Sequence, residues 1–210
     1  MIMRKRQIVV LGSSKAICTK NAYKIAEEVG EEIAKRGCIT MTGGGLGVME
    51  AALKGAKKQG GQTVAIIPWE NIYKVNDYAD IVIATGIGWS RDAINLNSCD
   101  GAIVVHGGAG TLNEVTYGYI SKKPIVAIKK SGGIAKDIAG KYLDIRKSAK
   151  IMNADSASEA VSKILNAVKE REKKGYIISD FDKDLLMMED KKDWDIIIKK
   201  KRKQLKKKQE

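Results

Sequence analysis

The chain has 210 residues, of which 44% are hydrophobic and 30% charged, a composition typical of a globular protein with one sizeable core. No apolar run reaches the ~20 residues of a membrane-spanning helix, and the N-terminus lacks a signal-peptide pattern, so we expect a cytoplasmic protein with no membrane partner. A single histidine, His106, and three cysteines without metal-type spacing exclude a multi-histidine metal site, and no metal ligands are predicted.

The net charge is +13, and eight of the ten residues from Lys199 to Lys208 are Lys or Arg. A basic run of this kind binds nucleic acid or other anionic surfaces weakly and without sequence specificity. It is also typical of a solvated surface rich in ion pairs. We favour the solvated surface and keep nucleic acid as a weak alternative partner.

Short apolar runs rich in β-branched residues alternate with stretches of helical spacing. Such runs predict strands that are buried on both faces. The predicted strands are residues 7–11, 38–42, 63–67, 81–84, 102–105, 124–128 and 151–153, and the predicted helices are 21–36, 48–59, 91–98, 111–121, 134–143 and 156–173. The alternation predicts an α/β fold, a Rossmann-like doubly wound parallel sheet with helices on both faces.

The character of the sequence changes at Gly175, where apolar clusters are followed by the basic run. We therefore expect a Rossmann-like nucleotide-binding domain at residues 1–174. Residues 175–210 are predicted to form a short C-terminal extension, a docking segment followed by a basic helical tail.

Glycine-rich loops follow the first, second and fifth predicted strands. Ligands of doubly wound sheets bind beyond the C-terminal strand ends, and a glycine loop that leads into a helix offers unobstructed amides and a positive dipole to an anion. The predicted phosphate- or nucleotide-binding residues are Gly12, Ser13, Gly43, Gly44, Gly45, Gly107, Gly108, Ala109, Gly110 and Thr111.

Three side chains near these loops have two interpretations each. Glu114 either faces the sugar of a ligand or completes a capping box with Thr111. Arg91 either pairs with a phosphate or ribose, or is a surface residue that opens a helix. Trp89 either stacks on a base or packs against the protein.

Other nucleotide-binding and catalytic motifs are missing. The loop after the first strand lacks the G-x-G-x-x-G spacing of dinucleotide sites, and no phosphate-binding G-x-x-x-x-G-K-[ST] motif is present. There is no G-x-S-x-G nucleophile motif either. No cofactor is predicted.

The segments Gly43–Ala51 and Gly107–Glu114, together with Arg91, resemble the LONELY GUY (LOG) superfamily over roughly residues 7–169. The resemblance implies a Rossmann-like homodimer that binds a nucleoside 5′-monophosphate, and we expect a homodimer or a higher homo-oligomer. In LOG enzymes the arginine and the motif glutamate act in hydrolysing the N-glycosidic bond, which releases the base and ribose 5-phosphate. Carried over, Arg91 and Glu114 are the predicted catalytic residues.

The chain departs from the LOG pattern at three positions. His106 stands for a proline, Asn113 for an acidic residue and Asp92 for a basic residue. These changes are more similar to a second branch of the superfamily, which includes molybdenum-cofactor carriers that hold a phosphorylated pterin without cleaving it. The resemblance therefore leaves open a phosphoribohydrolase or a non-catalytic carrier or sensor of a small phosphorylated ligand.

Overall fold

The computed structural model describes residues 4–147 and 149–173. The chain divides into two compact units, Met1–Asn166 and Ala167–Glu210, and the strands all belong to the first. Of the second unit, only the end of the last helix is described. The predicted docking segment and basic tail of residues 175–210 lie outside the described residues and stay predictions.

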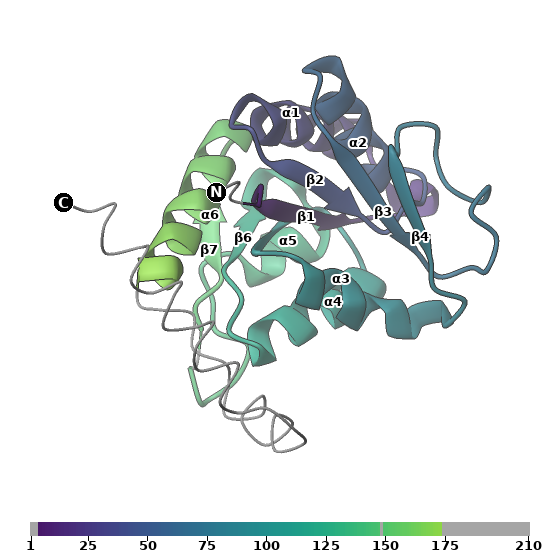
Figure 1. The fold of residues 1–210 in the computed structure, drawn as a ribbon. Coiled ribbons are helices and arrows are strands. Elements are labelled where there is room, and N and C mark those ends of the chain that lie inside the picture. Colours follow the sequence, from purple (N-terminus) through teal and green to yellow (C-terminus); the bar gives the residue numbers. More distant parts are fainter. Residues whose placement is uncertain (1–3, 148, 174–210) are drawn as a thin grey trace, which may run out of the picture. The chain divides into compact units, whose positions relative to one another are not determined.

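The centre of the first unit is a sheet in which every paired strand is parallel (Figure 1). Its order is β4-β3-β2-β1-β5-β6-β7, so the chain builds outward from β1 to β4 and then returns to the other side of β1. The order reverses between β1 and β5, which is where doubly wound sheets bind ligands. The strands are β1 Gln7–Gly12, β2 Ile39–Thr42, β3 Thr63–Ile67, β4 Ile81–Ala84, β5 Gly101–Val105, β6 Ile125–Ile128 and β7 Met152–Ala154.

Helices cover both faces of the sheet. Alternate strand residues such as Ile8 and Val10 join one core cluster with α1, α2 and α6, while Val9 and Leu11 join the other with α3, α4 and α5. Figure 1 shows α1 and α2 on one side of the strands and α3 and α4 on the other. The helices are α1 Lys20–Lys35, α2 Val48–Lys58, α3 Arg91–Ser98, α4 Ala109–Ile120, α5 Gly133–Ile138 and α6 Ala157–Lys173, with short 3-10 turns η1 Lys15–Ile17, η2 Gly88–Ser90 and η3 Lys129–Ser131. The predicted Rossmann-like fold is confirmed.

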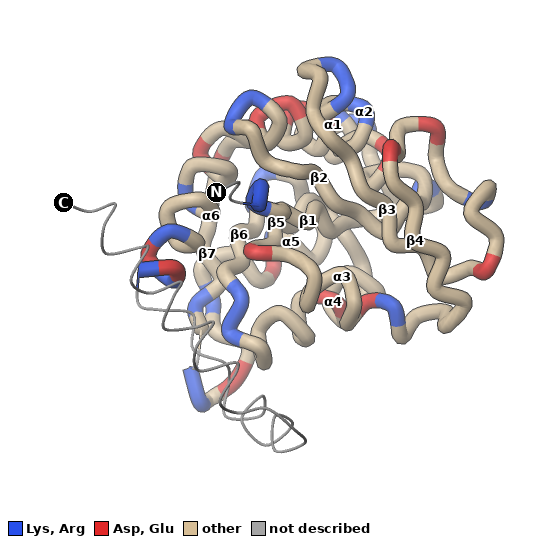
Figure 2. Tube along the Cα trace, viewed as in Figure 1, with Lys and Arg blue, Asp and Glu red and all other residues tan. Residues whose placement is uncertain are grey.

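The strands explain why the sequence folds this way. All residues of β3, β5 and β6 are buried, and the seven strands contain no charged residue, as the tan strands of Figure 2 show. Continuous apolar runs need cover on both faces, and the amphipathic helices supply it.

A glycine inside α1 has a packing reason. A Cβ on Gly30 would lie 1.9 Å from the backbone oxygen of Ala52, and one on Gly55 of α2 would lie 1.9 Å from that of Glu27. The two helices therefore cross with their backbones in close contact, which outweighs the poor helix propensity of glycine.

Two predicted helix boundaries were wrong. Helix α4 begins at Ala109, two residues before the predicted start, because Gly108 serves as its N-cap. Helix α5 ends at Ile138, five residues early. There the chain turns at Gly140 (φ 76°), whose N–H donates to the backbone oxygen of Ile151. This bond to the segment before β7 replaces the last helical turn that the sequence predicts.

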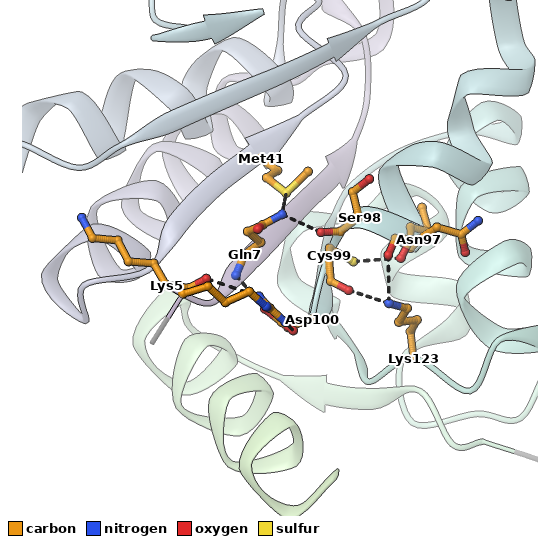
Figure 3. Close-up of polar contacts among 10 residues, drawn as sticks. Lys5, Gln7, Met41, Asn97, Ser98, Cys99, Asp100 and Lys123 are labelled. Carbon is orange, nitrogen blue, oxygen red and sulfur yellow. Dashed lines mark hydrogen bonds and ion pairs between the residues drawn. The ribbon is translucent and has the colours of Figure 1, made fainter. Parts of the chain in front are cut away.

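A polar cluster at the N-terminal strand ends fixes the far end of α3 (Figure 3). The buried Lys123 donates from Nζ to the backbone oxygen of Cys99 at 2.6 Å and of Asn97 at 3.3 Å, and Gln7 donates from Nε2 to the oxygen of Ser98 at 2.6 Å. Asp100 accepts from the N–H of Gln7 at 2.8 Å. These bonds satisfy carbonyls at the C-terminus of α3, and they hold the helix whose other end carries Arg91.

Among the helices of the described ranges, none is both long and apolar enough to span a bilayer.

Candidate functional site

Two of the predicted loops meet where the strand order reverses. Gly12, the last residue of β1, is in register with Val105, the last residue of β5. The loop that starts at Ser13 and the loop that starts at His106 therefore leave the sheet side by side. This is the expected position of a ligand site in such a sheet.

The loop that starts at His106 leads into α4, whose N-terminus has no side-chain cap. The N-cap of α4 is Gly108, which has no side chain to bond the first amides, and the first backward helical bond runs from Leu112 N to Gly108 O at 3.0 Å. Within the described part of the chain, the N–H groups of Ala109, Gly110 and Thr111 donate to no protein acceptor. Three amides and the positive end of the helix dipole are thus available at one helix end, an arrangement that favours an anion.

The backbone before α4 has unusual dihedral angles. His106 has φ 57°, a left-handed conformation that costs energy for a residue with a Cβ, and its N–H donates to Oγ of Ser131 at 2.7 Å. Gly107 has φ 97°, and a Cβ there would lie 2.6 Å from the Thr111 side chain. Gly107 is therefore required both by its backbone and by the buried Thr111 that covers it.

A buried charged cluster joins α3 to α4. Arg91, at the start of α3, donates from Nη1 to Oε1 of Glu114 at 3.0 Å and to Oδ1 of Asp92 at 2.7 Å. Asn113 donates from Nδ2 to Oδ2 of Asp92 at 2.9 Å. Arg91, Asp92 and Glu114 are respectively 6%, 1% and 8% exposed, so their charges interact across protein rather than water.

Burial controls the protonation of Glu114. Its pKa rises to about 7, first because desolvation disfavours the carboxylate; Arg91 opposes this rise and Asp92 adds to it. The fully buried Asn95 also lies near this carboxyl and favours its ionised form, although its amide makes no hydrogen bond of good geometry. Glu114 can therefore gain or lose a proton near neutral pH.

This geometry excludes the capping-box interpretation of Glu114. Thr111 is the third residue of α4 rather than its N-cap, and the Glu114 carboxyl faces Arg91 rather than the helix backbone. Arg91 is likewise no surface residue, since its guanidinium is buried and its Nε makes no hydrogen bond.

The glycine loop after β2 supports Arg91. A Cβ on Gly43 would lie 2.5 Å from Nη2 of Arg91, so the guanidinium packs on the bare backbone. The N–H of Gly44 donates to Oγ1 of Thr42 at 3.1 Å, and Asn76 donates from Nδ2 to the oxygens of Gly44 and Gly45, both at 3.0 Å. This loop is held by the protein itself, and the amide of Gly44 is already satisfied.

The loop after β1 is also packed closely. A Cβ on Gly12 would lie 2.2 Å from the oxygen of Val105, so this glycine is needed for the contact of β1 with β5. Ser13 is buried, and its backbone oxygen accepts from the N–H of Val48 at 3.0 Å. Its side-chain Oγ has no hydrogen-bond partner. Gly12 thus has a packing role, while Ser13 carries an unused polar group beside the switch point.

Exposed apolar groups border the helix N-terminus. Trp89 is 77% exposed, and its Cζ3 would lie 3.6 Å from a Cβ on Gly110. Ile17 of η1 is half exposed and would lie 3.1 Å from a Cβ on Gly108. A flat apolar group bound next to the α4 amides would contact both side chains.

The surroundings are basic. Lys15 lies three residues after the end of β1, and Lys129 and Lys130 follow β6 directly. All three are exposed and lie at the same edge of the sheet. Residues 1–173 contain 26 Lys and Arg against 17 Asp and Glu, so the excess positive charge is not confined to the tail. A positive field at this edge attracts anionic ligands.

Sequence reasoning missed part of this arrangement. It noted Asp92 and Asn113 only as departures from a pattern and did not single out Asn76 or Asn95. Asn76 belongs to a segment without periodicity, and no sequence signal links it to the glycine loop. In the described ranges, no group of three or more His, Cys, Asp and Glu could hold a metal ion.

The fold defines a Rossmann-like α/β protein, and its switch point carries three unpaired helix amides beside a buried Arg–Glu pair. The chain belongs to the SLOG cluster4 family, whose model (LDcluster4) matches residues 5–161.

The chain is similar to phosphoribohydrolases in sequence. The cytokinin riboside 5′-monophosphate phosphoribohydrolase of Mycobacterium tuberculosis is 38% identical over 118 residues, which are 52% of this chain and 63% of that enzyme. The chain thus matches less than two thirds of that enzyme's length.

Two solved structures whose names state a ligand or role are matched over almost their whole length. The molybdenum cofactor binding protein of Rippkaea orientalis is 33% identical with a TM-score of 0.70, and 80% of this chain covers 99% of it. The Moco carrier protein of Chlamydomonas reinhardtii is 34% identical with a TM-score of 0.70, at the same coverage of 80% and 99%. The chain therefore belongs to a LOG-like superfamily that includes proteins of the Moco-carrier type.

Proposed function

We propose that this chain binds a nucleoside 5′-monophosphate or a similar phosphorylated ligand and hydrolyses its N-glycosidic bond. The observation that carries the proposal is the buried bond from Arg91 of α3 to Glu114 of α4, the helix whose own N-terminus leaves three amides unpaired. A phosphate on those amides would anchor the ligand, and the carboxyl group lies one to two turns further along the same helix.

The proposed chemistry follows from these groups. The amides of Ala109, Gly110 and Thr111 bind the 5′-phosphate, and Arg91 orients the sugar phosphate. Glu114 stabilises the positive charge that develops on the ribose, or takes a proton from the attacking water, as carboxylates do in glycoside hydrolysis. Water adds to C1′, the C1′–N bond breaks, the base leaves with a proton, and ribose 5-phosphate remains.

The test is an incubation of the full chain with AMP and other nucleoside monophosphates, followed by chromatography of the free base and an assay of ribose 5-phosphate. Both products are expected in equal amounts, and Glu114→Ala or Arg91→Ala removes them. Nucleotides that bind and stay intact would contradict the hydrolase proposal.

A carrier or sensor is the second candidate, and two observations favour it. The chain aligns with 99% of the length of two proteins whose names describe Moco binding or carriage. In addition, Asp92 accepts a hydrogen bond from the Arg91 guanidinium that a ligand would otherwise use. A carrier is expected to gain thermal stability from its ligand without turnover. Native mass spectrometry of the protein from its own source would reveal a bound pterin or nucleotide.

We further propose a homodimer, as the LOG resemblance implies. Ile81 and Ile83 of β4 are each 45% exposed, and Ile120 of α4 is 65% exposed, on the sheet face covered by α3 and α4. A second copy would remove this apolar surface from water. Light scattering on the purified chain measures the mass directly, and Ile120→Asp is expected to lower it.

A further inference from the structure

Two carboxylates share one cation in the candidate site. Nη1 of Arg91 donates to Oδ1 of Asp92 at 2.7 Å and to Oε1 of Glu114 at 3.0 Å. All three side chains are buried, so a single positive charge faces two negative ones in a region of low dielectric. Under these conditions two neighbouring carboxyl groups resist being ionised together, and one of them tends to keep a proton.

The hydrogen bonds decide which of the two keeps it. Asp92 accepts from Arg91 through Oδ1 and from Asn113 through Oδ2, so both of its oxygens have a donor. Glu114 has one bond of good geometry, the longer one to Arg91. Because hydrogen-bond donors stabilise the ionised form of a carboxyl group, the proton resides on Glu114, which has fewer donors.

Two of the residues that depart from the LOG pattern, on either side of the cluster, bond to each other. Asn113 donates from Nδ2 to Oδ2 of Asp92 at 2.9 Å across 21 residues of sequence. Together they place a second carboxylate at Arg91 and a neutral donor that holds it.

We propose that Asp92, held by Asn113, is a positioning residue: it takes part of the Arg91 guanidinium away from Glu114 and so adds to the effect of burial, which favours the protonated form of Glu114. The charged groups that face Glu114 are Arg91 and Asp92, both on α3, with the neutral Asn95 of the same helix beside them. The direction of the pKa shift of Glu114 agrees with this arrangement.

The inference deepens the proposed function of the same site. A protonated Glu114 can donate a hydrogen bond to a ligand oxygen and adds no negative charge beside a bound phosphate. Above neutral pH it becomes a carboxylate that can accept a proton from water. Asp92 would set the pH at which the site passes from one state to the other.

The test is a titration of the ligand-free full chain by NMR, with ¹³C-labelled glutamate carboxyl groups and the Glu114 signal assigned from Glu114→Gln. The wild-type midpoint is expected near 7, and Asp92→Asn is expected to lower it by about one pH unit or more, because Arg91 is then left to Glu114 alone. Glu28→Gln, an exposed change on α1, is the control and leaves the midpoint unchanged.

A second variant covers the case in which Asp92→Asn fails to fold. Asn113→Ala removes the hydrogen bond that holds Asp92 beside Arg91, so Arg91 is freer to pair with Glu114 and the Glu114 midpoint falls. An unchanged midpoint in either folded variant, or a wild-type midpoint near 4.5, would overturn the inference.

This outcome is independent of turnover. A lowered midpoint without hydrolysis of AMP supports the role of Asp92 and contradicts the phosphoribohydrolase. Hydrolysis of AMP with an unchanged Glu114 midpoint in Asp92→Asn supports the phosphoribohydrolase and contradicts the role of Asp92. If both hold, the pH profile of hydrolysis moves in Asp92→Asn by the same interval as the NMR midpoint, which a purely structural role would not produce.

Discussion

The guanidinium of Arg91 rests on Gly43, where a Cβ would lie 2.5 Å from Nη2. The two residues belong to different βα units, so the contact links the loop after β2 with the start of α3. Through Arg91 it reaches Glu114 on α4. A residue with no side chain thus fixes the position of the buried cation of the site.

Gly43→Ala tests this contact. The added methyl group is expected to displace the guanidinium and break its bond to Glu114, which weakens ligand binding about tenfold or more. AMP-induced thermal stabilisation measures the effect. Gly45→Ala is the matched control in the same loop, because its Cβ would meet only the flexible end of Met49. Equal losses in both variants would contradict a specific role for Gly43.

Trp89 provides an optical test of the ligand's aromatic part. Its ring is 77% exposed and lies beside Gly110 at the start of α4. AMP is expected to quench tryptophan fluorescence by stacking its base on Trp89, whereas ribose 5-phosphate binds without quenching. Trp89→Phe removes the quenching and Trp69→Phe keeps it. Quenching that persists in Trp89→Phe would show that the base lies elsewhere.

Glu114 makes stability depend on pH. Its pKa rises from 4.5 in the unfolded chain to about 7 in the folded protein, so the folded protein holds an additional proton between these values. Stability is therefore lost as the pH rises from about 4.5 to 7 and is constant with respect to this group on either side. Glu114→Gln, which cannot ionise, escapes this loss.

Denaturant unfolding at several pH values measures the difference. Relative to wild type, Glu114→Gln is expected to gain on the order of 1–3 kcal/mol between pH 4.5 and 7.5. The matched change Glu28→Gln on α1 gains nothing over this window. A difference between Glu114→Gln and wild type that does not vary with pH would mean that Glu114 titrates normally.

Lys123 is predicted to stabilise the helix that carries Arg91. Lys123→Met leaves the oxygens of Cys99 and Asn97 without their donor and is expected to cost about 1–3 kcal/mol of unfolding free energy. Urea unfolding measures this loss. Lys136→Met, an exposed change on α5, is the control and stays within about 0.5 kcal/mol of wild type.

The basic run of residues 199–208 is predicted to have no part in binding the small ligand. A chain that ends at Ile198 keeps full stabilisation by AMP, because the amides and Arg91 are unaffected. If the chain binds nucleic acid, the affinity falls steeply with salt and is lost in the shortened chain. Filter binding at two salt concentrations checks this, and loss of AMP binding on shortening would contradict the prediction.

The sequence predicted the fold well because the signals are local. Apolar runs such as residues 102–105 specify buried strands, and residues with helical spacing specify the helices between them. The boundaries of α4 and α5 were missed because they depend on contacts. Gly108 became an N-cap only through the conformation of His106 and Gly107, and α5 ended only because Gly140 bonds to Ile151.

The sequence by itself determined the parallel α/β architecture and the presence of glycine loops at the strand ends. Only the tertiary structure decided that Arg91 bonds to Glu114 and that Asn113 bonds to the Asp92 carboxylate beside it. The reason is physical. Strand and helix formation depends on neighbours a few residues apart, whereas a hydrogen bond between residues more than twenty apart depends on how two helices pack on the sheet.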